Sequence, residues 1–533
     1  MNIFFAKKSL NHSNIKKIYL VLISFWIINF FFSNYQLIPN SDDVFYTFPA
    51  LGFKHLNEIS FTQFDLKYTF FERFPLYTLF LGIFYKIISP FLVLNFYTYK
   101  IINILIFILI LISSFIIIKK FSKNNNFNKI IFFPLALSIT PISQTYLSAR
   151  PEYLGILFTL LGIYFFISEK NKFKLYKYEI AFFIFGLSIL CHPCFLIFNF
   201  FIFLKFFFKN KLKKIIVCGF FNSLPIILLI FYYYINLPES LSQINLQAKG
   251  LPYFKAWKGL SSYSLDIFYN KDFLIGLVNT YYYLPSLLLI LYIFTNIKKI
   301  FSKLSKIKNN AVILSIFFSS IFLLILERNH PYLISISIFY LILFLFLIPW
   351  NTYFLNYILK KKNSFFIISF FIISSWNLIH LIKFNIYKER FLENTKLINL
   401  KKEIIKEKNP IFVTRPELAP YFIKEFDDQY KNKIEKDIFW LFPDNGRAKN
   451  TLEKEISEKN LNKLLNKYQN KKIYWLIGKK NFTNNCLTIN DALNYSKSIK
   501  IKFSDIEKYY ESNKHLIFTS NVTKFKENKN SCK

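Results

Sequence analysis

The chain has 533 residues, a length that in a soluble protein would suggest several domains. Hydrophobic residues make up 53% of it, charged residues only 19%, and phenylalanine alone contributes 69 residues. Soluble globular proteins carry more charge and fewer aromatic residues, and disordered chains are poor in aromatic residues. The composition excludes both classes for most of the chain and predicts an α-helical membrane protein that crosses the bilayer several times.

The excess of positive charge has two explanations. Lysine and arginine number 68 against 31 aspartates and glutamates, which gives a formal charge of +37. Such a charge is typical of nucleic-acid-binding proteins, but in a membrane protein lysine-rich cytoplasmic loops fix the orientation of the spans. We adopt the second explanation, because the lysines cluster between apolar runs. No nucleic-acid partner is expected.

The first apolar run covers residues 18–36 and follows a lysine-rich start. A signal peptide is the alternative, but the run is long and lacks a small-residue cleavage site, so we expect an uncleaved span with a cytoplasmic N-terminus. Residues 75–88 are too few to cross, since a spanning helix needs about 20 residues. They are expected to form a partly inserted or interfacial helix. Residues 91–118 are long enough to cross and end at a lysine cluster.

The later apolar runs alternate, with lysine clusters on one side and loops that carry acidic residues on the other. With the earlier runs they predict about eleven crossings of the plasma (inner) membrane. A crossing by residues 75–88 would invert every later segment, against the lysine pattern. The later runs are residues 130–147, 153–167, 180–191, 194–208, 215–235, 273–294, 311–326, 333–350 and 365–381.

The composition changes at about residue 385, where the chain becomes charged and its apolar runs become short. Residues 411–414 and 473–477 are expected as buried strands and residues 452–468 as a helix. We therefore expect a transmembrane domain over residues 1–384, with a first outer loop at 37–74, and a small soluble α/β domain over residues 385–533. The span count places that domain outside the cytoplasm.

An acidic pair, Asp42 and Asp43, directly follows the first span. Ser41 could cap a helix whose first turn holds both acids, because acidic side chains there suit the helix dipole. The other interpretation is a carboxylate at the membrane surface that acts as general base on an acceptor hydroxyl or amine. The residues alone leave both interpretations open.

Further polar patches lie on the same outer face under this topology. Singly, each could be a boundary cluster whose long side chains reach the interface, but arginine also binds phosphate through two parallel hydrogen bonds. His192, between two short helices, is as a lone histidine before proline more typical of a structural role. The patch residues are Glu72, Arg73, Arg150, Glu152, Arg328, His330 and Tyr332.

Several well-known catalytic motifs are absent from the sequence. It has no Walker A loop, no GxGxxG after a strand, no GxSxG and no HExxH. ATP-driven transport and serine or zinc hydrolysis are therefore not expected of this chain. Cys191 and Cys194 have CxxC spacing but flank His-Pro inside an apolar stretch, so a redox pair is not expected there either.

Four motifs, taken in order, resemble the GT-C superfamily of polyprenyl-phosphate-sugar glycosyltransferases, which includes protein O-mannosyltransferases and lipid A aminoarabinose transferases. The resemblance covers about residues 15–350. In the family the acidic pair is often Asp-Glu; here it is Asp-Asp, which leaves open which carboxylate is the base. The motifs are Ser-Asp-Asp-Val-Phe-Tyr at 41–46, Phe-Glu-Arg-Phe-Pro-Leu-Tyr at 71–77, Ala-Arg-Pro-Glu at 149–152 and Gly-Leu-Ser-Ile-Leu-Cys-His-Pro at 186–193.

The resemblance implies an inverting transfer of a sugar from a polyprenyl-phosphate donor to a lipid, glycan or protein acceptor at the outer face of the membrane. Asp42 would be the base and Asp43 its neighbour or the acceptor's orienter. Arg150 and Arg328 would hold the leaving phosphate with support from His330 and Tyr332. Substrate-binding roles would fall to Glu72, Arg73, Glu152 and His192.

Other questions stay open at this stage. The need for a divalent metal is not decided by the residues, and the long outer loop at 236–272 contains no histidine that could ligate one. A transporter or flippase of lipid-linked glycans is the alternative function. A transporter should carry ionisable residues near the middle of its spans, whereas these residues gather at the outer ends.

Overall fold

The computed structural model describes residues 41–56, 61–63, 66–68, 76–92, 94, 98–121, 149–168, 176–208, 210–236, 310–326, 331–347, 399, 411–414, 438–440, 472–478, 482–483, 486–489, 499–511 and 515–522. Helices dominate this part of the chain. They are α2 (Ser41–Leu56), α3 (Leu76–Ile88), α4 (Tyr99–Phe121), α6 (Glu152–Ile167), α7 (Lys177–Cys191), α8 (Phe195–Phe207), α9 (Leu212–Asn236), α16 (Asn310–Leu326) and α17 (Pro331–Leu347).

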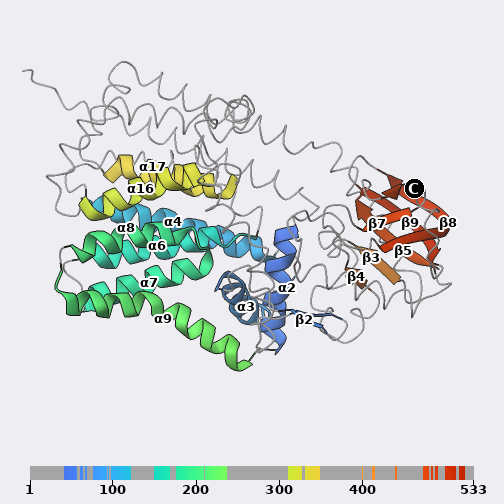
Figure 1. Ribbon diagram of the computed structural model, residues 1–533, viewed down its shortest axis with the longest axis horizontal. Coiled ribbons are helices and arrows are strands. Elements are labelled where there is room, and N and C mark those ends of the chain that lie inside the picture. Colours follow the sequence, from blue (N-terminus) through green and yellow to red (C-terminus); the bar gives the residue numbers. More distant parts are fainter. Residues whose placement is uncertain are drawn as a thin grey trace, which may run out of the picture.

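Most of these helices run side by side in one bundle, and α2 and α3 pack on each other at one end of it (Figure 1). Helix α6 lies inside the bundle, where it contacts α4 and α7 and buries side chains around its whole circumference. A helix that is apolar on all sides is either a core helix or a membrane span.

Glycines allow the closest approaches between the helices. A Cβ atom at Gly155 would collide with the ring of Phe195, and one at Gly186 would collide with the backbone oxygen of Asn222 in α9. Small residues at helix interfaces permit such close backbone packing in membrane proteins. Helices α16 and α17 are joined differently, because the hydroxyls of Ser320 and Ser337 each donate to the other residue's carbonyl oxygen, at 2.9 and 2.6 Å.

Two of the described helices are long and apolar enough to cross a membrane: α4, and α9 over Leu212–Tyr232. Both expose large apolar side chains, which in α4 recur every three or four residues and so form one stripe. Exposed apolar surface of this kind marks contact with lipid or with another protein. The stripe on α4 consists of Ile101, Leu105, Ile108, Ile112 and Phe115.

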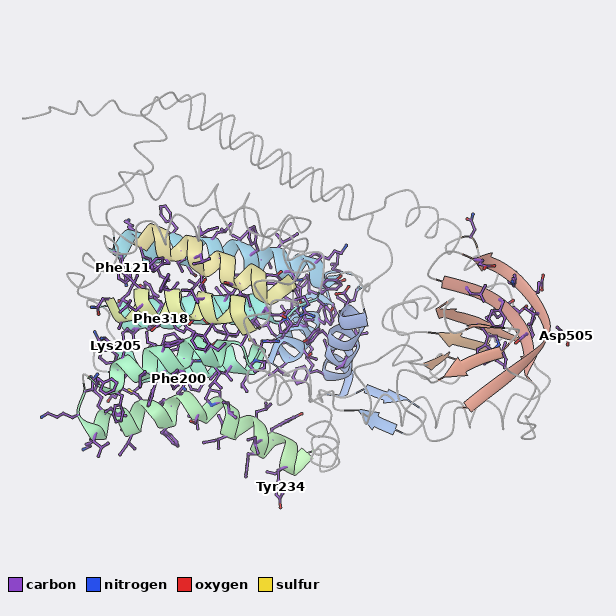
Figure 2. The ribbon with its side chains drawn as sticks, turned by 45° about the horizontal axis from the view of Figure 1, so that its top comes forward. Phe121, Phe200, Lys205, Tyr234, Phe318 and Asp505 are labelled. Atoms are coloured by element: carbon purple, nitrogen blue, oxygen red, sulfur yellow. The ribbon has the colours of Figure 1, made fainter. Side chains whose placement is uncertain are left out.

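The bundle has two chemically different ends. At one end the last turn of α4 meets the end of α6, where the Lys120 ammonium donates to the Ser168 hydroxyl at 3.0 Å and lies 3.7 Å from the centre of the Tyr164 ring. Figure 2 labels Phe121, the last residue of α4, and Lys205 at this end, and Tyr234 of α9 at the other end. Asp43 of the acidic pair and the Ala-Arg-Pro-Glu segment meet at the end away from Lys120 and Lys205.

The C-terminal strands form one mixed sheet in the order β4-β3-β5-β9-β8-β7-β6. Strands β3, β4 and β5 pair in parallel, and the other pairs are antiparallel. The strands are β3 (Ile411–Thr414), β4 (Ile438–Trp440), β5 (Ile473–Gly478), β6 (Phe482–Thr483), β7 (Cys486–Ile489), β8 (Ile499–Glu511) and β9 (His515–Val522). A separate short hairpin pairs β1 (Phe61–Gln63) with β2 (Leu66–Tyr68).

The described elements agree in type with those expected from the sequence, although their ends differ. Helices α3, α6, α7, α8, α9, α16 and α17 occupy runs expected to be helical, and β3 and β5 occupy the two expected strands. Helix α4 begins at Tyr99 rather than at residue 91, and residues 89–92 form turns around Pro90 after the end of α3. A proline disfavours helical geometry in the residue before it. The spans expected at 18–36, 130–147, 273–294 and 365–381, and the helix expected at 452–468, lie outside the described residues.

Candidate functional site

The site begins with Asp43 in the first turn of α2. Helix α2 begins at Ser41, so both acids fall in its first turn, and the Thr47 hydroxyl donates to the Asp43 carbonyl oxygen at 2.7 Å. The Asp43 side chain is only 2% exposed. A buried carboxylate needs hydrogen-bond donors or cations around it, because burial without them costs several kilocalories per mole, about 2–7 for even a neutral polar group.

One of these donors comes from the Ala-Arg-Pro-Glu motif at 149–152. The backbone N–H of Ala149 donates to Asp43 Oδ1 at 2.6 Å, and the two residues are 106 positions apart in the chain. This hydrogen bond joins the start of α2 to the segment that leads into α6. Two of the motifs that the sequence singled out therefore meet at one end of the bundle.

Arg150 and Glu152 form a buried ion pair beside this contact. The Arg150 guanidinium binds the Glu152 carboxylate through two hydrogen bonds, Nη2 to Oε1 at 2.5 Å and Nε to Oε2 at 3.2 Å. The anionic partner of Arg150 is thus its near neighbour in the chain. Burial alone would raise the pKa of the Glu152 carboxyl, but the charges of Arg150 and His192 and the hydrogen bond from Arg150 hold that pKa below its ordinary value.

His192 joins the site from the turn between α7 and α8. Its ring is half-buried, and Nδ1 accepts a hydrogen bond from the backbone N–H of Cys194 at 3.2 Å. That bond starts α8, so one ring nitrogen has a structural role. The histidine nevertheless lies within electrostatic reach of Glu152. Cys191 and Cys194 are buried free thiols.

Three further residues belong to this polar cluster. Lys100 and Asn103 in α4 were missed in the sequence, and Tyr77 in α3 ends the motif at 71–77 but was given no role. The Tyr77 hydroxyl donates to Asn103 Oδ1 at 2.8 Å, and its ring packs edge-on against Tyr46 with centroids 5.5 Å apart. Lys100 is only 7% exposed and interacts electrostatically with Asp43. Lys100 could have been found, because an ionisable residue within an apolar run is a functional candidate by default.

The remaining predicted site residues cannot be compared with this geometry. Glu72, Arg73, Arg328 and His330 lie outside the described residues. Asp42 precedes Asp43 in the first turn of α2, and Tyr332 falls in the first turn of α17, where the structure describes the backbone. In the described part of the chain, no three histidine, cysteine, aspartate or glutamate side chains are grouped so that they could hold a metal ion.

No model of a known protein family matches this chain, and no curated protein is similar to it at a significant level. Its function is therefore inferred from the geometry of the site. The site combines an acidic pair in the first turn of α2, at one end of the bundle, with a buried lysine and a buried arginine. Such an arrangement can place a carboxylate next to an acceptor group while cations favour an anionic substrate.

Proposed function

We propose that this protein is an integral membrane glycosyltransferase of the GT-C type. It would move a sugar, with inversion, from a polyprenyl-phosphate donor to a lipid, glycan or protein acceptor at the outer face of the plasma membrane. One observation carries the proposal: Asp43, from the acidic motif, accepts a hydrogen bond from Ala149, in the Ala-Arg-Pro-Glu motif. Both motifs resemble those of this superfamily, and the contact brings them to one end of the bundle.

The chemistry needs a base, a held phosphate and an oriented acceptor. Asp42 takes the proton from the acceptor's hydroxyl or amine as that group attacks the anomeric carbon. The bond between this carbon and the phosphate oxygen breaks, and the lipid phosphate leaves with the electron pair. Asp43 is held by Ala149 and keeps α2, and with it Asp42, in place. A positioned base of this kind typically contributes about a hundred- to ten-thousandfold in rate.

We assign the positively charged side chains of the site to the binding of the polyprenyl-phosphate donor. Arg150 is bound to Glu152, which compensates its charge, so its contribution would be to hold the Ala-Arg-Pro-Glu segment in place beside the donor. Arg328, His330 and Tyr332 remain candidates for direct contact with the phosphate. Lys100 adds a second buried positive charge.

The alternative function, transport of a lipid-linked glycan, has one observation in its favour. Lys100 is an ionisable residue within a helix that is long enough to span the membrane, and transporters place such residues within their spans. It is, however, the second residue of α4. Its position at the end of the helix favours the enzyme.

The proposal is tested in two stages. First, mass spectrometry of lipid A, cell-wall polymers and surface glycoproteins compares a deletion strain with a complemented strain and identifies the missing sugar. Second, transfer of this sugar from a polyprenyl-phosphate donor is measured in proteoliposomes with wild type, Asp42→Asn and Asp43→Asn. Asp42→Asn should lose at least about a hundredfold in turnover with donor binding nearly unchanged.

The outcomes separate the possible roles of the two acids. Asp43→Asn should cost less than Asp42→Asn, because the amide oxygen can still accept the hydrogen bond from Ala149. If Asp43→Asn were the inactive variant, the roles of the two acids would be exchanged. Near-normal turnover by both variants would refute the catalytic pair. A deletion strain with unchanged glycans but with mislocalised lipid-linked precursor would favour the transporter.

A further inference from the structure

The turn between α8 and α9 forms a cationic and apolar corner at the lysine-bearing end of the bundle. Helix α8 ends at Phe207 and α9 begins at Leu212. The Asn210 side-chain amide donates to the Phe206 carbonyl oxygen at 2.8 Å, and the N–H groups of Lys214 and Ile215 donate to the Lys211 carbonyl oxygen. We call this the α8–α9 corner; it consists of Lys205, Phe207, Phe208, Lys211, Leu212 and Lys213.

Large apolar side chains of the corner are exposed. Phe208 is 75% exposed and Leu212 is 66% exposed. The exposed apolar surface continues along α9 at Ile216 and Phe220, which lie four and eight residues beyond Leu212 and therefore on the same face of the helix. The corner is thus where a long exposed apolar stripe ends.

The lysines of the corner are not explained by the stability of the helices. Lys211 and Lys213 are exposed at the start of α9, where a positive charge opposes the helix dipole. Lys214 and Lys177 both lie over the ring of Tyr178, at 4.2 and 4.7 Å, which keeps two further positive charges nearby. The acidic residue of this region in the described chain, Glu179, has a buried carboxylate oxygen and does not neutralise the surface.

We propose that the α8–α9 corner binds the headgroups of anionic phospholipids. Within one helical turn the surface changes from lysine ammonium groups to exposed phenylalanine and leucine side chains. A bilayer has the same order, with headgroup phosphates at its surface and hydrocarbon beneath them. The aliphatic part of a lysine side chain can pack on the hydrocarbon while its ammonium group binds the phosphate. An acidic protein or a nucleic acid would match the charge but would leave the apolar stripe in water. The inference does not depend on sugar transfer.

Native mass spectrometry of the full-length protein in a neutral detergent tests this proposal. The protein is titrated with phosphatidylglycerol, with phosphatidylcholine and with glycerol phosphate, which carries a phosphate group but no acyl chains. Each surface lysine contributes about fivefold to the affinity for an anionic lipid. The double variant Lys211→Gln, Lys213→Gln should therefore bind phosphatidylglycerol about 25-fold more weakly and should bind phosphatidylcholine as the wild type does.

The matched control is Lys508→Gln in β8, which removes an exposed lysine from the C-terminal sheet and should change nothing. The thermal unfolding midpoints in neutral detergent should be equal for all variants, because both corner lysines are exposed. Equal binding of the two lipids by wild type would overturn the proposal, as would full retention of phosphatidylglycerol by the double variant. Displacement of the lipid by equimolar glycerol phosphate would show a simple phosphate site and would also overturn it.

Discussion

At the scale of single residues, Asp43 and Lys100 show how the site tolerates buried charge. Asp43 receives the Ala149 N–H and lies within electrostatic reach of Lys100 and of Tyr77. Charges in a low-dielectric interior interact more strongly than in water, so each group depends on its charged neighbours. The cluster links α2 and α3 to α4 and α6 through side chains rather than through loops.

Lys100→Met should destabilise the protein, because it removes a positive charge near a buried carboxylate while keeping the length of the side chain. Asp43→Asn in the same chain should recover part of the loss, since no buried negative charge remains and the amide oxygen still accepts from Ala149. We expect a coupling of roughly 0.5–3 kcal/mol in a double-mutant cycle of unfolding free energies. Additive effects of the two changes would contradict electrostatic coupling. Lys86→Met in α3, whose lysine lies 4.8 Å from the Phe53 ring, is the control.

The Arg150–Glu152 pair should behave as a buried ion pair. Glu152→Gln leaves the guanidinium without its compensating charge and should lower the free energy of unfolding by about 3 kcal/mol. Arg150→Lys keeps the charge but loses the two-bond geometry, and should cost about 1–2 kcal/mol. Thermal and denaturant unfolding in detergent measure both. If Arg150→Lys slowed sugar transfer while unfolding stayed at the wild-type value, direct phosphate contact would explain Arg150 better than the pair with Glu152.

The sequence identified part of this site for a physical reason. Asp43, Arg150 and Glu152 stand in short polar stretches between apolar runs, where charged residues are conspicuous. Lys100 falls inside a long apolar run, where one lysine hardly changes the mean hydropathy of the run. The pairing of Tyr77 with Asn103 depends on how α3 crosses α4, and no local pattern in the sequence encodes that crossing.

At the scale of elements, the close approach of α7 and α9 depends on Gly186. Gly186→Ala places a Cβ atom against the backbone oxygen of Asn222, and backbone cannot move aside as a side chain can. Overpacking of this kind costs about 1–3 kcal/mol, which a lowered unfolding midpoint would report. Gly219→Ala in α9 is the control, since its Cβ would lie 3.5 Å from the Phe203 ring, an ordinary contact. It should be neutral or stabilising by up to about 1 kcal/mol; equal losses in both variants would argue against the close-approach explanation.

Most described elements were predictable because each is an apolar run ended by lysine or proline. Their boundaries were less predictable, since α4 begins at Tyr99, later than its apolar run. The strands β3 and β5 were predictable from local apolar character. Their neighbours in the sheet were not, because β9 inserts between β5 and β8 from the far end of the chain.

At the scale of the whole molecule, the lysines that end α4 and α8 lie at one end of the bundle, and we propose from this a fixed orientation in the membrane. Lysines gather where α4 and α8 end and where α9 begins, and the acidic pair lies beside the start of α6. Lysine-rich loops stay in the cytoplasm. We therefore expect the N-terminus inside and residues 385–533 outside.

Cysteine labelling at Asn126 and Asn470 tests this orientation. An impermeant thiol reagent applied to intact cells should modify a cysteine at position 470 and should reach position 126 only after the membrane is permeabilised. Cys191, Cys194 and Cys218 are buried, and a variant without the native cysteines provides the background. Labelling of position 126 from outside, or protection of position 470, would reverse the orientation and remove the shared outer face of the proposed site.

The hydrogen bond from Ala149 to Asp43 can form only after the ribosome has made both residues. A ribosome that adds about 5–20 residues per second needs roughly 5–20 seconds to make the 106 positions that separate the two residues. During that interval α2 has been synthesised, but the backbone donor that holds its first turn does not yet exist. The acidic pair is therefore assembled against the bundle only after the start of α6 has been made. An incomplete chain that stops before residue 149 lacks this hydrogen bond and cannot hold the first turn of α2 as the full chain does.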